Sequence, residues 1–355
     1  MIVDLYGHAD LRTRLSRTVA RGALPASLLF HGPRGVGKQR LALWLGQLLL
    51  CESDSPPCGK CKSCGYARDL THPDLHWYFP RPRLKDADPD LEDVRDDYRE
   101  VIEARAENHG LYAATPGNEG IFVATVQAIV REASMSPAIG KRKVFVVGDA
   151  ERMGLQDGAE FAANAFLKLL EEPSPKTTII ITSSEPGALL PTIRSRTVAV
   201  RVGNLPETSV REFLGDPVVA ASLGITGAKA VTEKVQLAAG APGMLFGDEA
   251  RAKAMAAARK ILEAAASTKP SERHAAAMSV GAAGARGGFT EILDALVVIL
   301  AERMRAALHE GNTQRALAVS RAADLVGTAR LRASGNVNPQ LIVSGLLREI
   351  SGAVR

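Results

Sequence analysis

A glycine-rich loop constrains the fold of this chain more than any other feature of its sequence. The loop reads Gly32-Pro33-Arg34-Gly35-Val36-Gly37-Lys38-Gln39 and fits the pattern G-x-x-x-x-G-K. The apolar run Leu28–Phe30 before it predicts a buried strand, and we expect a helix to begin near Gly37. Strand, glycine loop and helix in this order are typical of a phosphate-binding P-loop, whose backbone N–H groups surround phosphate oxygens. Lys38 is expected to reach the β- and γ-phosphates of a nucleotide.

The residues that hold Mg²⁺ and activate water in a P-loop ATPase are altered here. Gln39 replaces the serine or threonine hydroxyl that ligates Mg²⁺, and its carboxamide is a poorer ligand. Asp149 follows a predicted strand, where a metal-binding acid belongs, but Ala150 replaces the glutamate that activates the attacking water. Glu151 lies one position further along and is expected to point elsewhere.

The loop and the acid together form a candidate nucleotide site that is degenerate. The sequence does not decide whether this site binds ATP and Mg²⁺, and efficient hydrolysis of ATP is not expected. The residues of this candidate site are Gly32, Gly35, Gly37, Lys38, Gln39 and Asp149.

All four cysteines are clustered, with the spacing Cys51-x6-Cys58-x2-Cys61-x2-Cys64. A disulfide framework spreads its bridges over a fold, whereas a tight cluster in a chain without a secretion signal indicates a metal site. Four thiolates complete the tetrahedral shell of a structural zinc ion and leave no position for water or substrate. We therefore expect Zn²⁺ on these four cysteines, and we interpret the nearby His72 and His76 as surface or packing residues.

The rest of the chain predicts an α/β domain followed by helices. A further buried strand is predicted at 143–147, other strands at 75–79, 177–182 and 198–202, and helices at 5–22, 123–133 and 157–172. This alternation is typical of a parallel sheet with helices on both faces. Residues 82–117 are rich in charge and polar nearly all round, which indicates a partly helical, surface-exposed insertion. After residue 203 the pattern predicts helices and no strand.

The composition limits the partners and the compartment. The net charge of +5 is compatible with DNA binding but too small to demand it. The N-terminal stretch has an acid at Asp4 and lacks the apolar core of a signal peptide. No apolar run approaches the roughly 20 residues of a membrane helix. We therefore expect a cytoplasmic protein with no membrane interaction.

Four further stretches carry a resemblance to a known family. They are Thr71–Asp74 (THPD), Asn164–Pro173 (NAFLKLLEEP), Leu189–Arg196 (LLPTIRSR) and Asn336–Leu341 (NVNPQL). With a cysteine cluster directly behind the P-loop helix, they resemble the bacterial clamp-loader AAA+ family, which comprises the gamma/tau and delta-prime subunits of DNA polymerase III. The resemblance covers most of the chain apart from 82–117. It implies an AAA+ P-loop domain over 1–203 with a zinc module at 51–64, a helical lid domain over 204–245 and a helical oligomerisation collar over 246–355.

Within that family, several residues favour the delta-prime type over the ATPase of the gamma/tau type. Gln39 and Ala150 weaken the ATPase site, and Met244 lies near the expected place of a sensor-2 arginine. The resemblance implies a subunit without independent activity that helps to load the sliding clamp on primed DNA, together with gamma/tau and delta subunits. It also implies that Arg196 acts in trans as an arginine finger on a neighbour's γ-phosphate, while a sensor-1 residue at Thr182 or Ser183 is a relic.

Three other functions fit parts of the pattern. An active gamma/tau-type AAA+ ATPase predicts ATP hydrolysis by the isolated chain that depends on Lys38. A nucleoside-phosphate kinase with a zinc-bearing lid would carry its cysteines mid-chain beside arginine pairs. In this chain the cysteines directly follow the P-loop helix. A stand-alone zinc-ribbon DNA-binding protein would need more basic residues near its cysteines than Lys60, Lys62 and Arg68.

Overall fold

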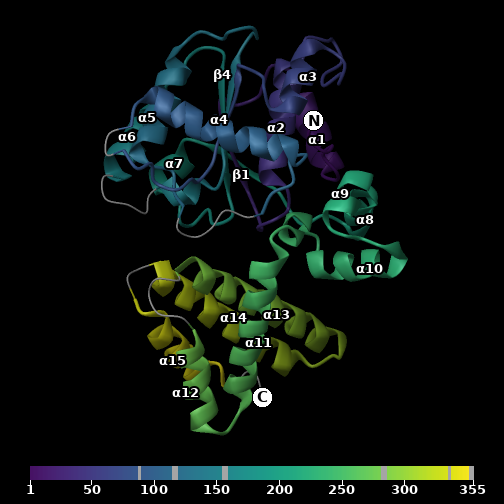
Figure 1. Ribbon diagram of the computed structural model, residues 1–355, viewed down its shortest axis with the longest axis vertical. Coiled ribbons are helices and arrows are strands. Elements are labelled where there is room, and N and C mark those ends of the chain that lie inside the picture. The colour runs from purple at the N-terminus through teal and green to yellow at the C-terminus, as the bar shows by residue number, and fades with distance from the viewer. Residues whose placement is uncertain (87–88, 114–118, 154–158, 281–285, 335–336, 352–355) are drawn as a thin grey trace. The chain divides into compact units, whose positions relative to one another are not determined.

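The computed structural model describes residues 1–86, 89–113, 119–153, 159–280, 286–334 and 337–351 of the chain. These residues form two compact units, one up to Phe246 and the other from Gly247 onward (Figure 1). Within the described ranges, no helix is long and apolar enough to cross a membrane. Parts of the predicted insertion (87–88 and 114–117) and Asn336 of the last motif lie outside the described residues.

A five-stranded parallel sheet forms the centre of the first unit, in the order β2-β3-β4-β1-β5. The strands are β1 (Ser27–His31), β2 (Leu75–Tyr78), β3 (Lys143–Val147), β4 (Thr177–Ser183) and β5 (Val198–Arg201). The predicted strands and the parallel α/β class are confirmed. β3 and β4 are buried along their whole length, as expected for parallel strands covered on both faces. Because parallel strands end at one edge, the P-loop after β1 lies beside the residues that follow β3 and β4.

Helices surround this sheet: α1 (Ala9–Ala20), α2 (Lys38–Leu50), α3 (Lys62–Asp69), α5 (Val123–Ser134), α6 (Ala159–Glu171) and α7 (Pro191–Ser195). Helix α2 begins directly after Gly37, whose φ of 92° is a left-handed conformation that favours glycine. Its residues Leu41, Leu45 and Leu48 are buried in the core of the unit. The predicted sequence of strand, glycine loop and helix is therefore confirmed.

The charged insertion contains a further helix, α4 (Leu91–Glu107), which begins with a capping box formed by Asp90 and Asp93. Val94 and Tyr98 on this helix are buried, and the Tyr98 hydroxyl donates to the carbonyl of Phe79. The prediction of partial helix is confirmed. The prediction of a surface-exposed segment that is polar all round is wrong for this face, because two residues one turn apart suffice to anchor an otherwise charged helix.

A buried carboxylate on α5 holds α4 against the sheet. Glu132 accepts hydrogen bonds from the Tyr78 hydroxyl and from Arg95 Nε, both at 2.6 Å, and lies 2.9 Å from His76 Nδ1. Although burial raises the pKa of Glu132, hydrogen bonds from these partners lower it to about 2. The His76 ring also stacks on Phe145, which confirms the prediction that this histidine is a packing residue.

The end of the first unit is helical, with α8 (Glu207–Gly215), α9 (Pro217–Ser222), α10 (Gly227–Ala238) and the 3₁₀ helix η2 (Pro242–Leu245). Val210, Leu214 and Val235 form a small apolar cluster there, together with Val3 and Leu111 from earlier in the chain. The described residues contain no strand beyond β5, as predicted. A domain boundary near residue 203 stays a prediction.

The second unit consists of α11 (Asp248–Ala266), α12 (Pro270–Ser279), α13 (Arg286–His309), α14 (Thr313–Ser334) and α15 (Pro339–Glu349), drawn in green to yellow in Figure 1. α13 and α14 pack along each other, and α11 packs on α13. Ala258, Ala265 and Ala322 are fully buried in its core beside Leu296 and Leu300. Small side chains at these contacts let helices approach closely, which accounts for the alanine-rich sequence of this region.

Candidate functional site

The phosphate loop has the backbone shape that its sequence predicts. Gly32, Gly35 and Gly37 all have positive φ angles. A Cβ on Gly32 would lie 1.9 Å from the carbonyl oxygen of Val202, and a Cβ on Gly35 would lie 2.5 Å from Cγ of Met244. Glycine is therefore required at these two positions by close neighbours as well as by conformation.

Lys38, the first residue of α2, is buried and turned back on its own loop. Its ammonium group donates to the carbonyl oxygens of Gly32 at 2.9 Å and Pro33 at 2.8 Å, and to Ser184 Oγ at 2.9 Å. Burial lowers the pKa of Lys38 to about 8, although the nearby carboxylates of Asp149 and Glu151 act in the opposite direction. The donors that a P-loop lysine offers to phosphate are thus used within the chain.

Gln39 joins the loop to the strand end where a metal-binding acid was predicted. Its Nε2 donates to Asp149 Oδ2 at 3.1 Å, and its Oε1 accepts from Trp77 Nε1 at 2.9 Å. The Tyr112 hydroxyl lies 3.5 Å from the same oxygen. A Cβ on Gly148 would lie 2.5 Å from Gln39 Cδ, so the carboxamide packs directly on the end of β3. The position of the missing hydroxyl is therefore filled by a side chain with its own partners.

Glu151 does not point away from the site, and the prediction that it does is wrong. It lies on the short 3₁₀ helix η1 (Ala150–Met153), is buried, and accepts the Ser184 backbone N–H at 3.0 Å. Ser184 in turn receives Lys38. Burial raises the pKa of the Glu151 carboxyl group, and the nearby Asp149 adds to this effect. Thr182, a predicted sensor-1 residue, accepts the backbone N–H of Asp149 at 3.2 Å.

The 3₁₀ helix η2 lies on the outer side of the loop. The backbone N–H of Gly243 donates to the carbonyl of Gly35 at 2.9 Å, and Met244 packs against Gly35. A cavity of about 170 Å³ lies between the loop, η2 and the segment 110–112. This volume is well below the roughly 300–1,000 Å³ of pockets that hold a small organic ligand.

The segment 110–112 belongs to the predicted insertion, and sequence reasoning missed its contribution to the site. Leu111 and Tyr112 are apolar residues in a charged stretch, and this apolar interruption could have indicated a buried segment. Tyr112 packs over the guanidinium group of Arg105, at 4.0 Å from its ring centroid. Arg105 also lies 3.4 Å from the ring centroid of Phe79 and 4.6 Å from that of Trp77. The insertion thus builds an aromatic cluster around the side of the loop that carries Gln39.

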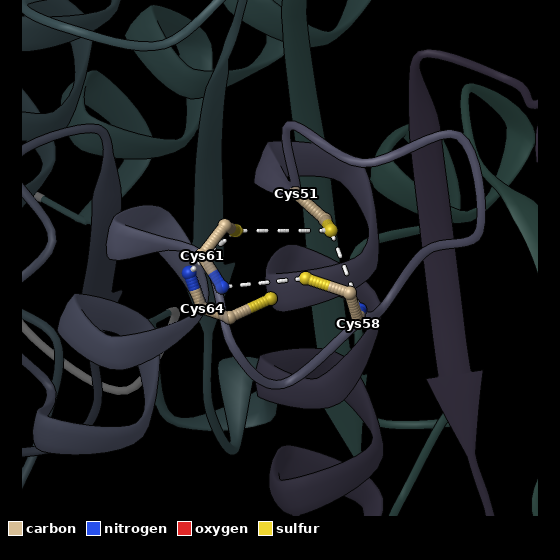
Figure 2. A group of neighbouring side chains, drawn as sticks. All are labelled: Cys51, Cys58, Cys61 and Cys64. Atoms are coloured by element: carbon tan, nitrogen blue, oxygen red, sulfur yellow. Dashed lines mark hydrogen bonds between the residues drawn. The ribbon is translucent and has the colours of Figure 1, made fainter.

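The four cysteine side chains point toward one another (Figure 2). Their sulfur atoms all lie within 4.8 Å of one another, and the Sγ atoms of Cys51 and Cys61 are 3.9 Å apart. A regular ZnS₄ tetrahedron with Zn–S bonds of about 2.3 Å has edges of about 3.8 Å. The residues therefore fit a tetrahedral zinc ion in both number and spacing.

Backbone N–H groups stabilise thiolates in this cluster. Cys58 Sγ accepts from the N–H groups of Lys60 at 3.5 Å and Cys61 at 3.4 Å, which lowers its pKa to about 6. Burial raises the pKa of Cys64 to about 12, and a metal ion bound to this sulfur would favour its thiolate form. In the described residues His72 is buried and accepts the N–H of Asp74 with Nδ1, consistent with its predicted packing role.

Arg196, the predicted arginine finger, lies far along the chain from the phosphate loop and directly follows α7. Its Nε donates to Glu171 Oε1 at 2.6 Å, and its Nη1 donates to the carbonyl of Thr192 at 3.1 Å. The Arg196 side chain is 32% exposed and that of Glu171 is 44% exposed. Because an ion pair this exposed is weak, the guanidinium group remains able to exchange Glu171 for another anion.

Comparison with known proteins gives matches over the first unit. A family model described as "DNA polymerase III, delta subunit" matches residues 7–206. A DNA polymerase III subunit delta' from Pseudomonas aeruginosa is 33% identical over 172 residues, which are 48% of this chain and 40% of that protein. A DNA polymerase III subunit gamma/tau from Mycobacterium tuberculosis is 28% identical over 213 residues, which are 59% of this chain and 30% of that protein.

These matches leave much of each relative uncovered, because the chain spans less than half the length of both relatives. Among solved structures, a DNA polymerase III gamma subunit-related protein from Thermotoga maritima is 21% identical. It covers 97% of this chain and 99% of its own, with a TM-score of 0.41.

Proposed function

Because the chain belongs to the DNA polymerase III delta-subunit family, whose model covers more than half of it, we propose that it is a delta-prime-type clamp-loader subunit. In this role it helps the other loader subunits, of the gamma/tau and delta types, to place a sliding clamp on primed DNA in the cytoplasm. The proposal is supported most by the internal hydrogen bonds of the phosphate loop, since a subunit that hydrolyses ATP needs those donors for the nucleotide.

An impaired ATPase is the first part of this proposal. Lys38 is held by Gly32 and Pro33, and Gln39 replaces the hydroxyl ligand of Mg²⁺ and donates to the Asp149 carboxylate. Ala150 supplies no carboxylate to activate water. Three groups needed for Mg²⁺-dependent hydrolysis are thus either bound within the chain or missing.

A contribution of Arg196 to a neighbouring subunit's ATP site is the second part. A guanidinium group stabilises charge that develops on the transferred phosphoryl group, and it acts across a subunit boundary only if it is accessible. Arg196 meets this requirement, because its one carboxylate partner among the described residues is exposed. The γ-phosphate of the neighbour's ATP would replace Glu171 as the partner of Arg196.

The remaining parts of the chain receive structural roles. Zn²⁺ on Cys51, Cys58, Cys61 and Cys64 holds the loop between α2 and α3 in place and supplies no catalysis, because the four sulfurs fill its coordination shell. Residues 204–245 form the lid over the phosphate loop. Residues 246–355 form the helical collar through which the subunits associate.

The experiment that tests the proposal reconstitutes the loader with its other subunits and measures DNA-stimulated ATP hydrolysis and clamp loading. Arg196→Ala is expected to lower both by at least tenfold, since an arginine finger contributes about 10³-fold or more to phosphoryl transfer. Arg194→Ala is the matched control, because Arg194 is an exposed arginine two residues earlier, on helix α7, and is expected to leave both unchanged.

A second measurement addresses the chain's own site. The purified chain is expected to show no ATP turnover, and Lys38→Met in the reconstituted loader is expected to leave clamp loading within twofold of wild type. ATP turnover by the isolated chain that Lys38→Met abolishes would instead support an active gamma/tau-type subunit. Unchanged clamp loading by the Arg196→Ala loader would contradict the arginine finger.

A further inference from the structure

A second cavity in the first unit lies between the N-terminal segment, α2 and the cysteine module. Its volume is about 450 Å³, within the range of pockets that hold a small organic ligand. Residues 2–5 form one wall, and α3 forms another with Ala67 and Arg68. The two walls are joined by the N–H of Ile2, which donates to the carbonyl of Arg68 at 2.9 Å.

One face of α2 is turned into this cavity. Arg40, Leu43, Trp44 and Gln47 are spaced three and four residues apart and all line it. A helix face in a densely packed domain normally contacts another element, because interiors leave few voids larger than a water molecule. Here the buried side chains of Leu43 and Trp44 line the cavity together with the hydrogen-bonding side chains of Arg40 and Gln47.

The cavity is positively charged. Arg12, Arg40 and Arg68 line it, and Asp4 is the one carboxylate among its described lining residues. Three positive charges against one negative leave a formal charge of +2 on the lining. Such a surface in a partly enclosed space attracts a small anion.

The guanidinium donors in this cavity are not all used by the protein. Nε of Arg68 is buried and has no hydrogen-bond partner in the described part of the chain. Arg12 donates to the carbonyl of Leu5 at 3.2 Å and lies over the Trp44 ring, 5.1 Å from its centroid. Arg40 donates to the carbonyl of Val3. Buried polar groups in proteins are nearly always paired, so the unpaired Arg68 Nε shows that the protein itself does not use every guanidinium donor beside this cavity.

We propose that this cavity binds the phosphate monoester of a small organic molecule. A phosphate monoester carries a charge of about −1.5 to −2 at pH 7, which matches the charge of the lining. The guanidinium groups of Arg12 and Arg68 bind its oxygens, since the fork of an arginine fits phosphate in a bidentate manner. The organic part lies against the apolar surface formed by Leu43, Trp44 and Pro57.

This site is distinct from the candidate nucleotide site. Neither Lys38 nor any glycine of the phosphate loop lines the second cavity. Gly59 lines it from the cysteine loop, so the zinc module forms part of the wall. Binding here therefore requires the folded cysteine module but not the P-loop lysine.

The test is calorimetric titration of the full chain with phenyl phosphate, inorganic phosphate and phenol. Phenyl phosphate is expected to bind, inorganic phosphate at least tenfold more weakly, and phenol not at all. Binding of phenyl phosphate is expected to weaken at least threefold as the pH falls from 7 to 5, because the second phosphate pKa is about 6. Lys38→Met is expected to bind phenyl phosphate as the wild type does.

Arg68→Gln and Arg12→Gln are each expected to weaken the binding of phenyl phosphate at least tenfold. Arg17→Gln is the matched control, because Arg17 is exposed on α1 and does not line the cavity. Zinc content and thermal unfolding confirm that each variant is folded. If Arg68→Gln does not fold, Arg12→Gln alone tests the role of the guanidinium groups.

Three outcomes would overturn the proposal. They are no binding of phenyl phosphate at millimolar concentrations, unchanged affinity in both arginine variants, and loss of binding in Lys38→Met. Equal affinity for inorganic phosphate and phenyl phosphate would overturn the organic part of the proposed ligand.

Discussion

The cysteine cluster and the phosphate loop are both ligand-binding motifs, and they satisfy their polar atoms in opposite ways. In the cluster, four sulfur atoms converge, and burial opposes the ionisation of Cys64. In the loop, Lys38 is bonded to Gly32 and Pro33, and Gln39 to Asp149. The loop supplies substitutes for both phosphate and magnesium from within the chain, whereas the cluster keeps four converging sulfur atoms that are compatible with a metal ion.

The difference shows that a chain can keep the backbone shape of a ligand-binding motif without needing the ligand for its stability. Backbone geometry keeps the P-loop shape through Gly32 and Gly35, whose close neighbours allow no Cβ. The affinity for a ligand depends on whether donors and acceptors remain free after folding. By this criterion the cysteine cluster is expected to depend on a bound metal ion more than the phosphate loop depends on a nucleotide.

The largest expected effect is the loss of zinc. Cys61→Ser is expected to abolish zinc binding and to lower the free energy of unfolding by roughly 5 kcal/mol, because the fold around a structural metal depends on its ligand. Elemental analysis of the freshly purified protein and thermal unfolding measure these effects.

The control for zinc loss is Ser55→Ala, a change at an exposed residue of the same loop that is expected to keep the metal. If the purified wild-type protein contains no zinc, the cysteine cluster does not need a metal ion, and the contrast with the phosphate loop is wrong.

The next effect is the pH dependence of stability that Lys38 causes. Its pKa in the folded chain is about 8, below its ordinary value of 10.5. Between these pH values the unfolded chain holds a proton that the folded chain lacks, so the free energy of unfolding rises with pH. The rise is at most about 3 kcal/mol, from 1.36 kcal/mol per pKa unit.

Urea unfolding from pH 7.5 to 10.5 measures this rise in wild type and in Lys38→Met. The variant is expected to show a flatter pH profile, while Lys229→Met, which removes an exposed lysine, follows the wild type. Identical profiles for wild type and Lys38→Met would mean that Lys38 is solvated and available to phosphate.

A smaller effect is expected for Gln39→Thr, which restores the hydroxyl group of an ATP-binding loop. The change leaves Trp77 Nε1 without its acceptor and Asp149 without a donor, at a cost of about 2 kcal/mol in the free energy of unfolding. Urea unfolding measures it, with Gln236→Thr on the exposed face of α10 as the control. An unchanged or higher stability would contradict the structural role of this carboxamide.

The smallest effect on the free energy of unfolding is expected for the ion pair of Arg196, because its partner Glu171 is present and exposed. Glu171→Gln is expected to lower the free energy of unfolding by less than about 1 kcal/mol, and less at high salt, because exposed ion pairs are weak. The adjacent Glu172→Gln is the control. A loss of more than about 2 kcal/mol would show that Arg196 is bound too firmly to serve a neighbouring subunit.

Much of the fold could be predicted because the signals were local. The runs at Leu28–Phe30 and Val144–Val147 are apolar without interruption, as buried parallel strands are, and both lie in strands. The cysteine spacing placed four sulfur atoms around one point because consecutive ligands in a knuckle are fixed by short turns.

The rest could not be predicted because it depends on neighbours that are distant in the sequence. Gln39 was recognised as a missing hydroxyl, but its bonds to Trp77 and Asp149 arise only when three strand ends meet. Glu151 was expected to point elsewhere, and the 3₁₀ turn after β3 brings it to Ser184. The anchoring of α4 by Val94 and Tyr98 was concealed by the charge around them.

The N-terminal segment has one further consequence. Val3, Asp4 and Leu5, with Arg40, line both the small cavity beside the phosphate loop and the arginine-lined cavity. One stretch of backbone is therefore a partition with a separate compartment on each side. A molecule in one cavity that moved this stretch would change the affinity of the other cavity, and thermodynamic reciprocity would make the two changes equal.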